Sequence, residues 1–219
     1  MSDPIRSALA ALVTGEPLSS DAVEQVAGAI LDGEASPARI AAFLIGLRVR
    51  GESAQELAGF VRALRARALS VDAPGGTIDT CGTGGDGSGT FNISTASAIL
   101  VAAAGVPVAK HGNRAVSSRS GSSDVIGALG IAVEATPAQA EAALREVGFA
   151  YLHAPAFHPG MRHPGPVRAE LGVRTAFNLV GPLANPARVR RQLIGVADPG
   201  DRKSTRLNSS HGYISYAVF

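Results

Sequence analysis

Hydrophobic residues in the first seventy positions recur at helical spacing in four successive stretches. Within each stretch the apolar side chains stand three or four residues apart, which is the pattern of an amphipathic helix with one buried face. The stretches begin at residues typical of helix starts, namely Asp3-Pro4, Asp21 with Glu24, Ser36-Pro37 and Ser53 with Glu56. Gly15 and Gly51 follow the first and third stretches as stop signals. We interpret residues 1–70 as a helical domain for packing or dimerisation, because they contain no catalytic cluster.

The pattern changes after a linker rich in proline and glycine at residues 71–76. The predicted elements beyond it are, in order, a strand at 77–80, a helix at 94–104, a strand at 106–109, a helix from Thr136-Pro137, and strands at 149–152 and 189–196. A strand, a helix and a strand in succession form a βαβ unit, whose two strands are parallel. Residues 77–200 are therefore predicted to form part of an α/β domain with a parallel sheet.

Residues 155–186 contain six of the chain's 13 prolines and two short helical stretches. A segment interrupted so often is a poor candidate for a sheet element. We expect the helices of residues 164–186 to pack toward the N-terminal helical domain. The fold class is then α/β, with a helical domain beside a parallel-sheet domain.

The composition indicates a globular chain with a sizeable core, since 46% of residues are hydrophobic and 17% charged. The net charge of +2 is weak support for nucleic-acid binding. The single cysteine, Cys81, excludes an intrachain disulfide and is interpreted as a small packing residue. The longest apolar run, residues 98–109, is too short to span a bilayer, and the N-terminus lacks the basic region of a signal peptide. We expect a cytoplasmic protein.

A glycine-rich loop, residues 82–89, follows the first predicted strand and precedes a helix. It satisfies the spacing G-x-G-x-x-G, but the second strand ends in Lys110-His111 rather than in the acidic residue that a dinucleotide site needs. No Gly-Lys-Ser/Thr closes the loop, which excludes a P-loop. Its backbone N–H groups can still approach phosphate oxygens at the start of a helix. The alternative is a tight turn with no ligand.

Two polar segments accompany this loop. Residues 92–95 begin the helix, where their side chains either cap it or bind a phosphate or its Mg²⁺. Residues 110–123 form a predicted second loop after the second strand, where open α/β sheets bind ligands. Lys110 is one of only two lysines, against eighteen arginines, and a compact ammonium suits a point contact to phosphate. The alternative is a solvated basic loop.

Residues 79–87 (DTCGTGGDG), 92–95 (NIST) and 110–114 (KHGNR) closely resemble the anthranilate phosphoribosyltransferase family. The later stretches His158–Met161, Pro166–Arg168, Arg174-Thr175 and Phe177–Leu183 are also similar to that family, and the resemblance runs from about residue 4 to residue 199. It implies a type III phosphoribosyltransferase fold, like that of nucleoside phosphorylases. It also implies transfer of the phosphoribosyl group from phosphoribosyl pyrophosphate to the amine of anthranilate in tryptophan biosynthesis, with Mg²⁺ as cofactor, in a homodimer formed through the helical domain.

The resemblance also assigns the site residues, and it assigns no protein nucleophile. The phosphoribosyl pyrophosphate contacts are Gly82, Gly85, Asp86, Thr90, Asn92, Ile93, Ser94, Thr95, Lys110, His111, Gly112, Asn113, Arg114, Ala115, Val116, Ser117, Ser118 and Ser122, with Ser94 also a Mg²⁺ ligand. The anthranilate contacts are Gly82, Asn113 and Arg168, the last holding the carboxylate. His111 and His158 are expected at the entry for the aromatic substrate, whereas His153 and His163 are expected to be structural.

The chain departs from the family in two places. The acidic Asp-Glu pair that holds a second Mg²⁺ in the family does not occur after Asp86. Residues 201–219 match nothing in the family, and Ser204–His211 lack helical or strand periodicity. We therefore expect a C-terminally truncated, inactive chain with an unrelated tail. Two rival functions remain open: a non-catalytic relative that binds nucleic acid, and a pyrimidine nucleoside phosphorylase.

Overall fold

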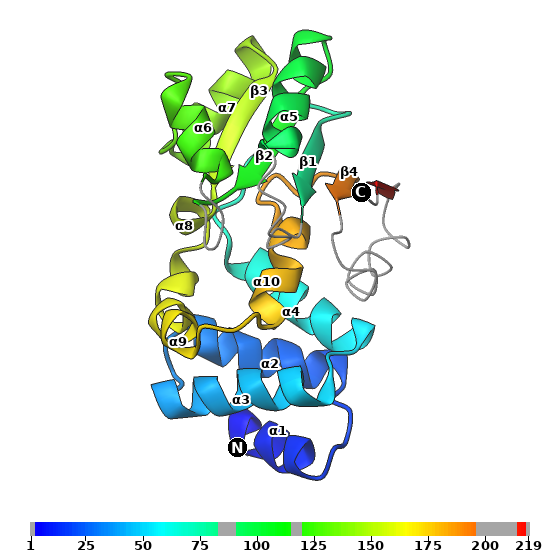
Figure 1. Ribbon diagram of the computed structural model, residues 1–219, viewed down its shortest axis with the longest axis vertical. Helices are drawn as coiled ribbons and strands as arrows, with labels where there is room; N and C mark the ends of the chain where they lie inside the picture. Colours follow the sequence, from blue (N-terminus) through cyan, green and yellow to red (C-terminus); the bar gives the residue numbers. More distant parts are fainter. Residues whose placement is uncertain (1–2, 83–90, 115–119, 196–213, 218–219) are drawn as a thin grey trace. The chain divides into compact units, whose positions relative to one another are not determined.

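The computed structural model describes residues 3–82, 91–114, 120–195 and the backbone of 214–217, in two compact units (Figure 1). One unit comprises Met1–Ala68 and His158–Ala184, and the other Leu69–Phe157 and Asn185–Phe219. The chain therefore passes from the first unit to the second after Ala68, returns to the first at His158, and enters the second again at Asn185.

The first unit is helical. Its elements are α1 (Pro4–Val13), α2 (Ser20–Leu31), α3 (Pro37–Arg50), α4 (Ala54–Arg67), η1 (Pro159–Arg162), α9 (Pro164–Leu171), α10 (Ala176–Val180) and η2 (Gly181–Ala184). The predicted N-terminal helical domain is confirmed. Helix α9 packs on α3 and α10 packs on α4, where Phe177 meets Phe60 edge-on with ring centroids 5.0 Å apart. Aromatic rings from distant parts of the chain thus share one core.

Two helix starts show how local signals succeed and fail. At α4 the predicted capping box is present, because Ser53 Oγ accepts from Glu56 N and Glu56 Oε2 accepts from Ser53 N at 2.8 Å. At α2 the predicted box is wrong, because the helix is capped two residues earlier, by Ser19 Oγ. Asp21 and Glu24 instead pair with Arg62 of α4. A partner 38 or more positions away is invisible to a local motif.

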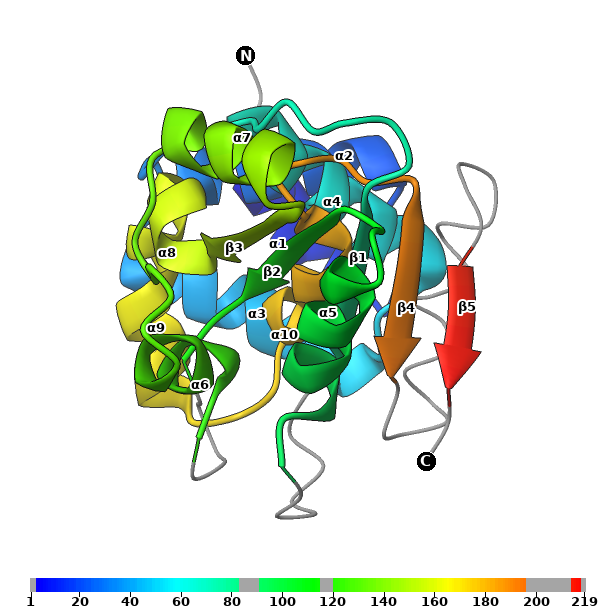
Figure 2. The same ribbon diagram turned by 90° about the horizontal axis from the view of Figure 1, so that it is seen from above.

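The second unit contains a parallel sheet with strand order β3-β2-β1-β4-β5 among its described residues. The strands are β1 (Ile78–Gly82), β2 (Val108–Gly112), β3 (Phe149–His153), β4 (Arg191–Gly195) and β5 (Ile214–Ala217). The helices are α5 (Ile93–Ala103), α6 (Ser122–Ala128), α7 (Pro137–Glu146) and α8 (Ala154–Phe157). Figure 2 shows α5 and α7 on opposite sides of β1 to β3. The predicted parallel α/β domain is confirmed.

Three boundaries differ from the sequence predictions. Strand β2 continues to Gly112, so Lys110 and His111 lie in the sheet and not in a loop. The following polar stretch ends in helix α6, which had no apolar period strong enough to predict it. Residues 214–217, predicted to lie in a tail outside the fold, pair with β4. The unpaired N–H and C=O groups of an edge strand accept such a segment readily.

Candidate functional site

The predicted ligand-binding residues of the second unit gather at the carboxyl ends of adjacent parallel strands. Gly82 ends β1, and Gly112 ends β2 beside His153 at the end of β3. Helix α5 starts soon after β1, and α6 soon after β2. This edge is where open parallel sheets bind ligands, because the connecting loops and helix starts converge there.

The structure describes only part of the predicted site. The described members of the second unit are Gly82, Asn92, Ile93, Ser94, Thr95, Lys110, His111, Gly112, Asn113, Arg114 and Ser122. Gly85, Asp86, Thr90, Ala115, Val116, Ser117 and Ser118 lie outside the described residues. Arg168 belongs to the first unit.

The start of α5 is fastened to β1 and β2 by two buried polar side chains. Thr80 Oγ1 donates to Ser94 O at 2.7 Å. Lys110 Nζ donates to Thr80 O at 2.7 Å and to Ser94 Oγ at 3.3 Å. These bonds bring the ammonium of Lys110 to the hydroxyl of Ser94 at the first turn of the helix. A positive charge and backbone N–H groups meet there, as an anion site requires.

Asn92 joins this arrangement to the start of α6. It makes no capping bond to α5, so the predicted capping role is wrong for its side chain. Its Nδ2 instead lies 3.3 Å from Ser120 O and 3.4 Å from Gly121 O. The amide therefore ties together the two segments on which the predicted diphosphosugar contacts lie.

Lys110 is fully buried, with 1% of its surface exposed, so the alternative of a solvated basic loop does not hold for this residue. Burial lowers the pKa of its ammonium, and the unlike charge of Asp79 opposes that effect. A buried lysine needs internal hydrogen-bond acceptors, and Thr80 O and Ser94 Oγ supply two. Lys110 is therefore first a structural cation of the sheet, placed at the edge where a phosphate would arrive.

Asp79 is a buried charged residue beside the candidate site to which the sequence analysis gave no role of its own. Its carboxylate is wholly buried and accepts from His111 N at 3.3 Å, Asn185 Nδ2 at 2.9 Å and Gln192 Nε2 at 3.2 Å. Burial raises the pKa of Asp79, while Lys110 and these bonds lower it. The carboxylate thus joins β1, β2 and β4. Only its position beside the glycine loop pointed to it, because Asn185 and Gln192 are more than a hundred positions away.

Gly112 has no room for a side chain. A Cβ there would overlap Ser122 Oγ and would lie 2.7 Å from Tyr151 OH. Because these atoms belong to α6 and β3, the glycine lets the end of β2 approach both elements. Packing alone therefore requires a glycine at a position that the family resemblance assigned to ligand contact.

Arg168 lies on α9, in the first unit. Its guanidinium carbon is 5.5 Å from the centre of the Phe177 ring, and its Nε has no hydrogen-bond partner within the described part of the chain. Burial lowers the pKa of this guanidinium, which nevertheless stays charged at neutral pH. A half-buried cation stacked on an aromatic ring, with a donor still unused, suits a planar carboxylate.

The cysteine and three of the histidines singled out in the sequence are buried: Cys81, His111, His153 and His158. Burial raises the pKa of Cys81 far above neutrality, so its thiol stays protonated. Burial lowers the pKa of His153, and it lowers the pKa of His158 to about 4, so both imidazoles are neutral at pH 7. His111 contributes its backbone N–H to Asp79. None of these groups is poised as a nucleophile.

Ser94 is the one predicted Mg²⁺ ligand among the described residues. The described part of the chain has no group of three or more His, Cys, Asp or Glu side chains that could hold a metal. Next to Ser94, the hydroxyl of Thr95 is buried without a hydrogen-bond partner in the described structure. Mg²⁺ commonly takes one or two protein oxygens and completes its shell with substrate phosphates and water. The residues present fit that mode, in which the diphosphate brings most of the ligands.

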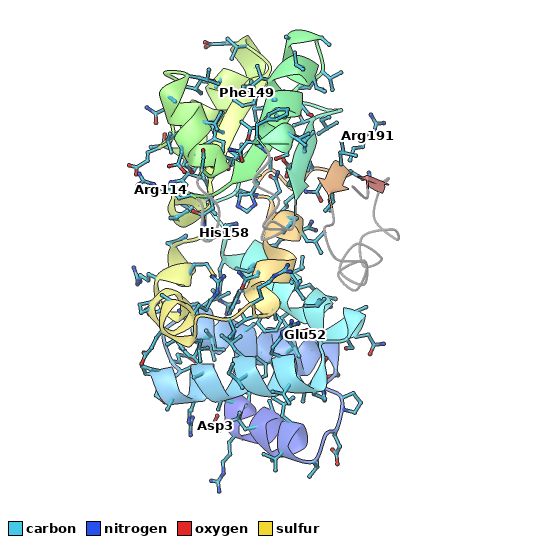
Figure 3. The ribbon with its side chains drawn as sticks, viewed as in Figure 1. Asp3, Glu52, Arg114, Phe149, His158 and Arg191 are labelled. Carbon is cyan, nitrogen blue, oxygen red and sulfur yellow. The ribbon has the colours of Figure 1, made fainter. Side chains whose placement is uncertain are left out.

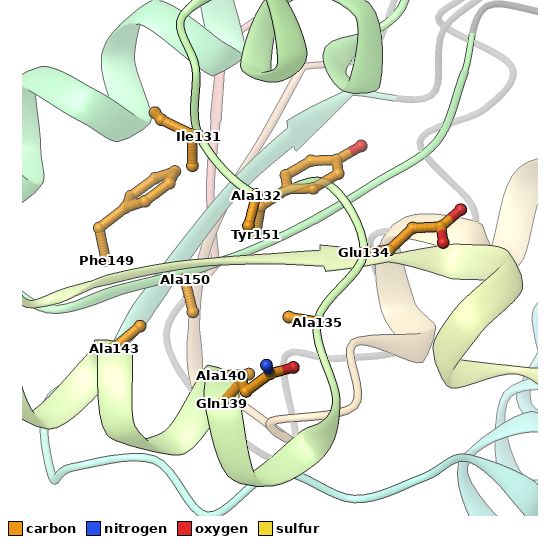
Figure 4. A pocket seen from close by; sticks show the side chains of 10 residues that line it. All are labelled: Ile131, Ala132, Glu134, Ala135, Gln139, Ala140, Ala143, Phe149, Ala150 and Tyr151. Atoms are coloured by element: carbon orange, nitrogen blue, oxygen red, sulfur yellow. The ribbon is translucent and has the colours of Figure 1, made fainter.

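A pocket of about 180 Å³ is lined by α7, β3 and the segment before α7 (Figure 4). It is lined mainly by alanines of α7 and β3 and by the preceding segment around Ile131, with Glu134, Gln139 and Tyr151 as its polar side chains. It contains none of the predicted ligand contacts and no nucleophile beside a base. We assign no chemistry to it.

Two known domain families match the chain. Residues 6–68 match the glycosyl transferase family, helical bundle domain, and residues 74–205 match the glycosyl transferase family, a/b domain. The chain belongs to this glycosyl transferase family. The type III architecture predicted from the resemblance is thereby confirmed. In the described residues, no helix is long and apolar enough to cross a membrane.

Individual relatives share one name. The anthranilate phosphoribosyltransferase of Rubrobacter xylanophilus is 54% identical over 196 residues, which are 90% of this chain and 57% of that protein. The crystal structure of the Thermus thermophilus enzyme of that name has a TM-score of 0.87 and 44% identity, and covers 96% of this chain and 65% of that one. The Saccharomyces cerevisiae enzyme in complex with phosphoribosyl pyrophosphate and Mg has a TM-score of 0.87 and 29% identity, and covers 97% of this chain and 64% of that one. The predicted resemblance is confirmed, and the chain spans little more than half the length of the curated relatives it matches.

Proposed function

We propose that this chain carries the phosphoribosyl pyrophosphate site of an anthranilate phosphoribosyltransferase. Such an enzyme produces N-(5-phosphoribosyl)anthranilate and pyrophosphate for tryptophan biosynthesis. One observation carries the proposal: the Lys110 ammonium and the Ser94 hydroxyl meet 3.3 Å apart at the start of α5, in a chain half identical to enzymes of that name. A phosphate group placed there would meet a cation, a hydroxyl and helix N–H groups together.

The reaction breaks the bond between the anomeric carbon and the pyrophosphate oxygen, through an oxocarbenium-like state. Negative charge therefore grows on the leaving group, and donors already in place stabilise it. Lys110 and the N–H groups at the start of α5 supply such donors. Mg²⁺ held by Ser94 would neutralise part of the same charge when bound. The amine of anthranilate is itself a nucleophile, so the chain needs to position it and not to activate it.

Arg168 is proposed to hold the carboxylate of anthranilate, with Gly82 and Asn113 as further contacts. The half-buried Arg168 has an unused Nε donor and a stacking partner in Phe177. Replacing Arg168 with Ala is expected to weaken anthranilate binding at least tenfold, ~1.4 kcal/mol, because a bidentate charged bond is lost. The affinity for phosphoribosyl pyrophosphate should change little. Equal losses for both ligands, measured by calorimetry, would show that Arg168 has a structural role.

A panel of ligands separates this proposal from its rivals. The chain is titrated calorimetrically with phosphoribosyl pyrophosphate plus Mg²⁺, with anthranilate, with thymidine plus phosphate, and with single-stranded DNA. The proposal predicts binding of the first two. Binding of thymidine with phosphate would favour a pyrimidine nucleoside phosphorylase, and salt-sensitive DNA binding alone would favour a nucleic-acid-binding relative.

The assembly and location of the protein are also proposals. We propose a homodimer through the helical domain, supported by the exposed apolar side chains of Val13 and Val49, and a cytoplasmic location. Light scattering on the chain and on a variant with Val13→Asp and Val49→Asp tests the dimer. A dimer mass for the unsubstituted chain and a monomer mass for the variant are expected.

A further inference from the structure

Three hydroxyl groups form a hydrogen-bonded cluster between β3 and the start of α6. Tyr151 OH lies 2.8 Å from Ser122 Oγ and 2.8 Å from Ser123 Oγ. Ser122 Oγ lies 3.0 Å from the carbonyl oxygen of Asn113, just beyond β2. Tyr151 is 2% exposed and Ser123 3% exposed, so water does not replace these partners. Ser122 and Asn113 are predicted ligand contacts, whereas neither Tyr151 nor Ser123 has been assigned a role.

The direction of each bond follows from the number of protons. The carbonyl oxygen of Asn113 can only accept, so the single proton of Ser122 Oγ is used there. Tyr151 must then donate its own proton to Ser122 Oγ, because two acceptors facing each other at 2.8 Å would repel. Ser123 in turn must donate to Tyr151. The protons therefore point one way, from Ser123 through Tyr151 and Ser122 to Asn113.

We propose that Tyr151 is a positioning residue that holds the Ser122 hydroxyl and the Asn113 backbone in the arrangement that binds the diphosphosugar. This inference rests on the proposed function, because it concerns the same ligand. Tyr151 is bonded to the site through the Ser122 hydroxyl, which in turn is bonded to Asn113 O. Gly112 permits the arrangement, since any Cβ there would displace both Ser122 Oγ and Tyr151 OH.

The direction of these hydrogen bonds also limits how the Ser122 hydroxyl can bind a ligand. Its proton is committed to Asn113, so in this arrangement it presents a lone pair and not a donor. A phosphate oxygen accepts from Ser122 only when the O–H turns away from Asn113, and the bond from Tyr151 holds the oxygen in place during that turn. Burial raises the pKa of Tyr151, so the phenol remains a donor at neutral pH.

The first test observes the tyrosine itself in the ligand-free chain. Only three tyrosines occur, at 151, 213 and 216, so labelling the ζ-carbon of tyrosine with ¹³C gives three NMR signals, and Tyr151→Phe identifies one. Ser122→Ala and Ser123→Ala should each shift the Tyr151 signal, whereas Ser97→Ala, on α5, should not. A Tyr151 signal that neither serine substitution moves would show that the hydroxyls are not bonded in solution.

The second test measures the consequence for ligand binding. Tyr151→Phe should weaken phosphoribosyl pyrophosphate binding with Mg²⁺ about tenfold, comparable to one lost hydrogen bond. In a Ser122→Ala background the same change should have little further effect, since the route to the ligand is already cut. Full and additive losses in the double variant would overturn the positioning role. If the unsubstituted chain binds no phosphoribosyl pyrophosphate, the proposed function and this ligand both fail, and the NMR shifts still decide whether the cluster exists.

Discussion

Lys110 and Asp79 are buried residues of opposite charge on neighbouring strands, and both make hydrogen bonds to surrounding polar groups. Asn185 and Gln192 donate to Asp79, and Lys110 donates to Thr80 O and Ser94 Oγ. Burying a charge without such partners is strongly unfavourable. The same bonds that stabilise the fold therefore also hold the start of α5 where the proposed diphosphate binds. Arg114, at the rim of this site, remains at the surface (Figure 3).

A Lys110→Met change should destabilise the chain as well as weaken ligand binding. It removes the cation near Asp79 and leaves Thr80 O without its donor, at a cost of roughly 2–3 kcal/mol in the free energy of unfolding. Combining it with Asp79→Asn should cost less than the two single changes together, because neither charge is then left alone. Urea unfolding of the four proteins measures this coupling. Strictly additive losses would mean that the two charges do not interact.

His158 should make stability depend on pH. Its folded-state pKa is about 4, well below the ordinary value of 6.5, because it is buried in the first unit. Between these two values the unfolded chain binds more protons than the folded one, so the stability from His158 is present above pH 6.5 and is lost as the pH falls toward 4. At pH 4.5 the loss is about 2–3 kcal/mol.

The measurement compares the unfolding free energy of the unsubstituted chain and of His158→Gln at about pH 7.5 and about pH 4.5, on either side of the ordinary histidine pKa. The substituted chain should lose less stability on acidification. His163→Gln is the control, because it changes another histidine of the same unit. An identical pH dependence in the unsubstituted and His158→Gln chains would contradict this role.

At the scale of elements, hydrophobic periodicity predicted the long helices and the positions of β1 to β4 along the chain, and it failed where side chains are polar for structural reasons. Strand β2 was predicted to end at residue 109 because Lys110 and His111 look like loop residues. Their partners, Thr80, Ser94 and Asp79, come from β1 and α5 and cannot be read from a local pattern. Helix α6 was missed for the same reason, since it begins with the polar residues Ser122, Ser123 and Asp124.

Because β2, β3 and α6 lie so close together, we expect two glycines of the sheet to differ sharply in the stability lost on substitution with alanine. Gly112→Ala should destabilise the chain by roughly 2 kcal/mol and weaken phosphoribosyl pyrophosphate binding, because its Cβ has no space. Gly195 ends β4 in the same sheet, and a Cβ there would meet its nearest atom, Cys81 O, at an ordinary 3.8 Å. Gly195→Ala is therefore the matched control and should be close to neutral. Thermal unfolding of both variants measures this difference, and an equal loss of stability in the two would contradict the prediction.

At the scale of the whole molecule, the sequence predicted two parts and the structure has two units, with residues 158–184 grouped with the first helices. The motifs pointed to one ligand site because phosphate-binding residues are short-range patterns at strand ends. The residues that support the site are not: Asp79, Asn185, Gln192 and Tyr151 act through contacts between distant segments. The sequence motifs therefore pointed to the proposed ligand contacts more readily than to the residues that support them.

We infer that this chain binds phosphoribosyl pyrophosphate through the start of α5 with Mg²⁺. The most direct measurement is calorimetric titration of phosphoribosyl pyrophosphate into the chain, with Mg²⁺ and then with a chelator, for the unsubstituted protein, Ser94→Ala and Ser97→Ala. We expect Mg²⁺-dependent binding that Ser94→Ala weakens at least tenfold, ~1.4 kcal/mol, and that Ser97→Ala leaves unchanged. No binding to the unsubstituted chain, or equal affinity in the Ser94→Ala variant, would contradict the claim.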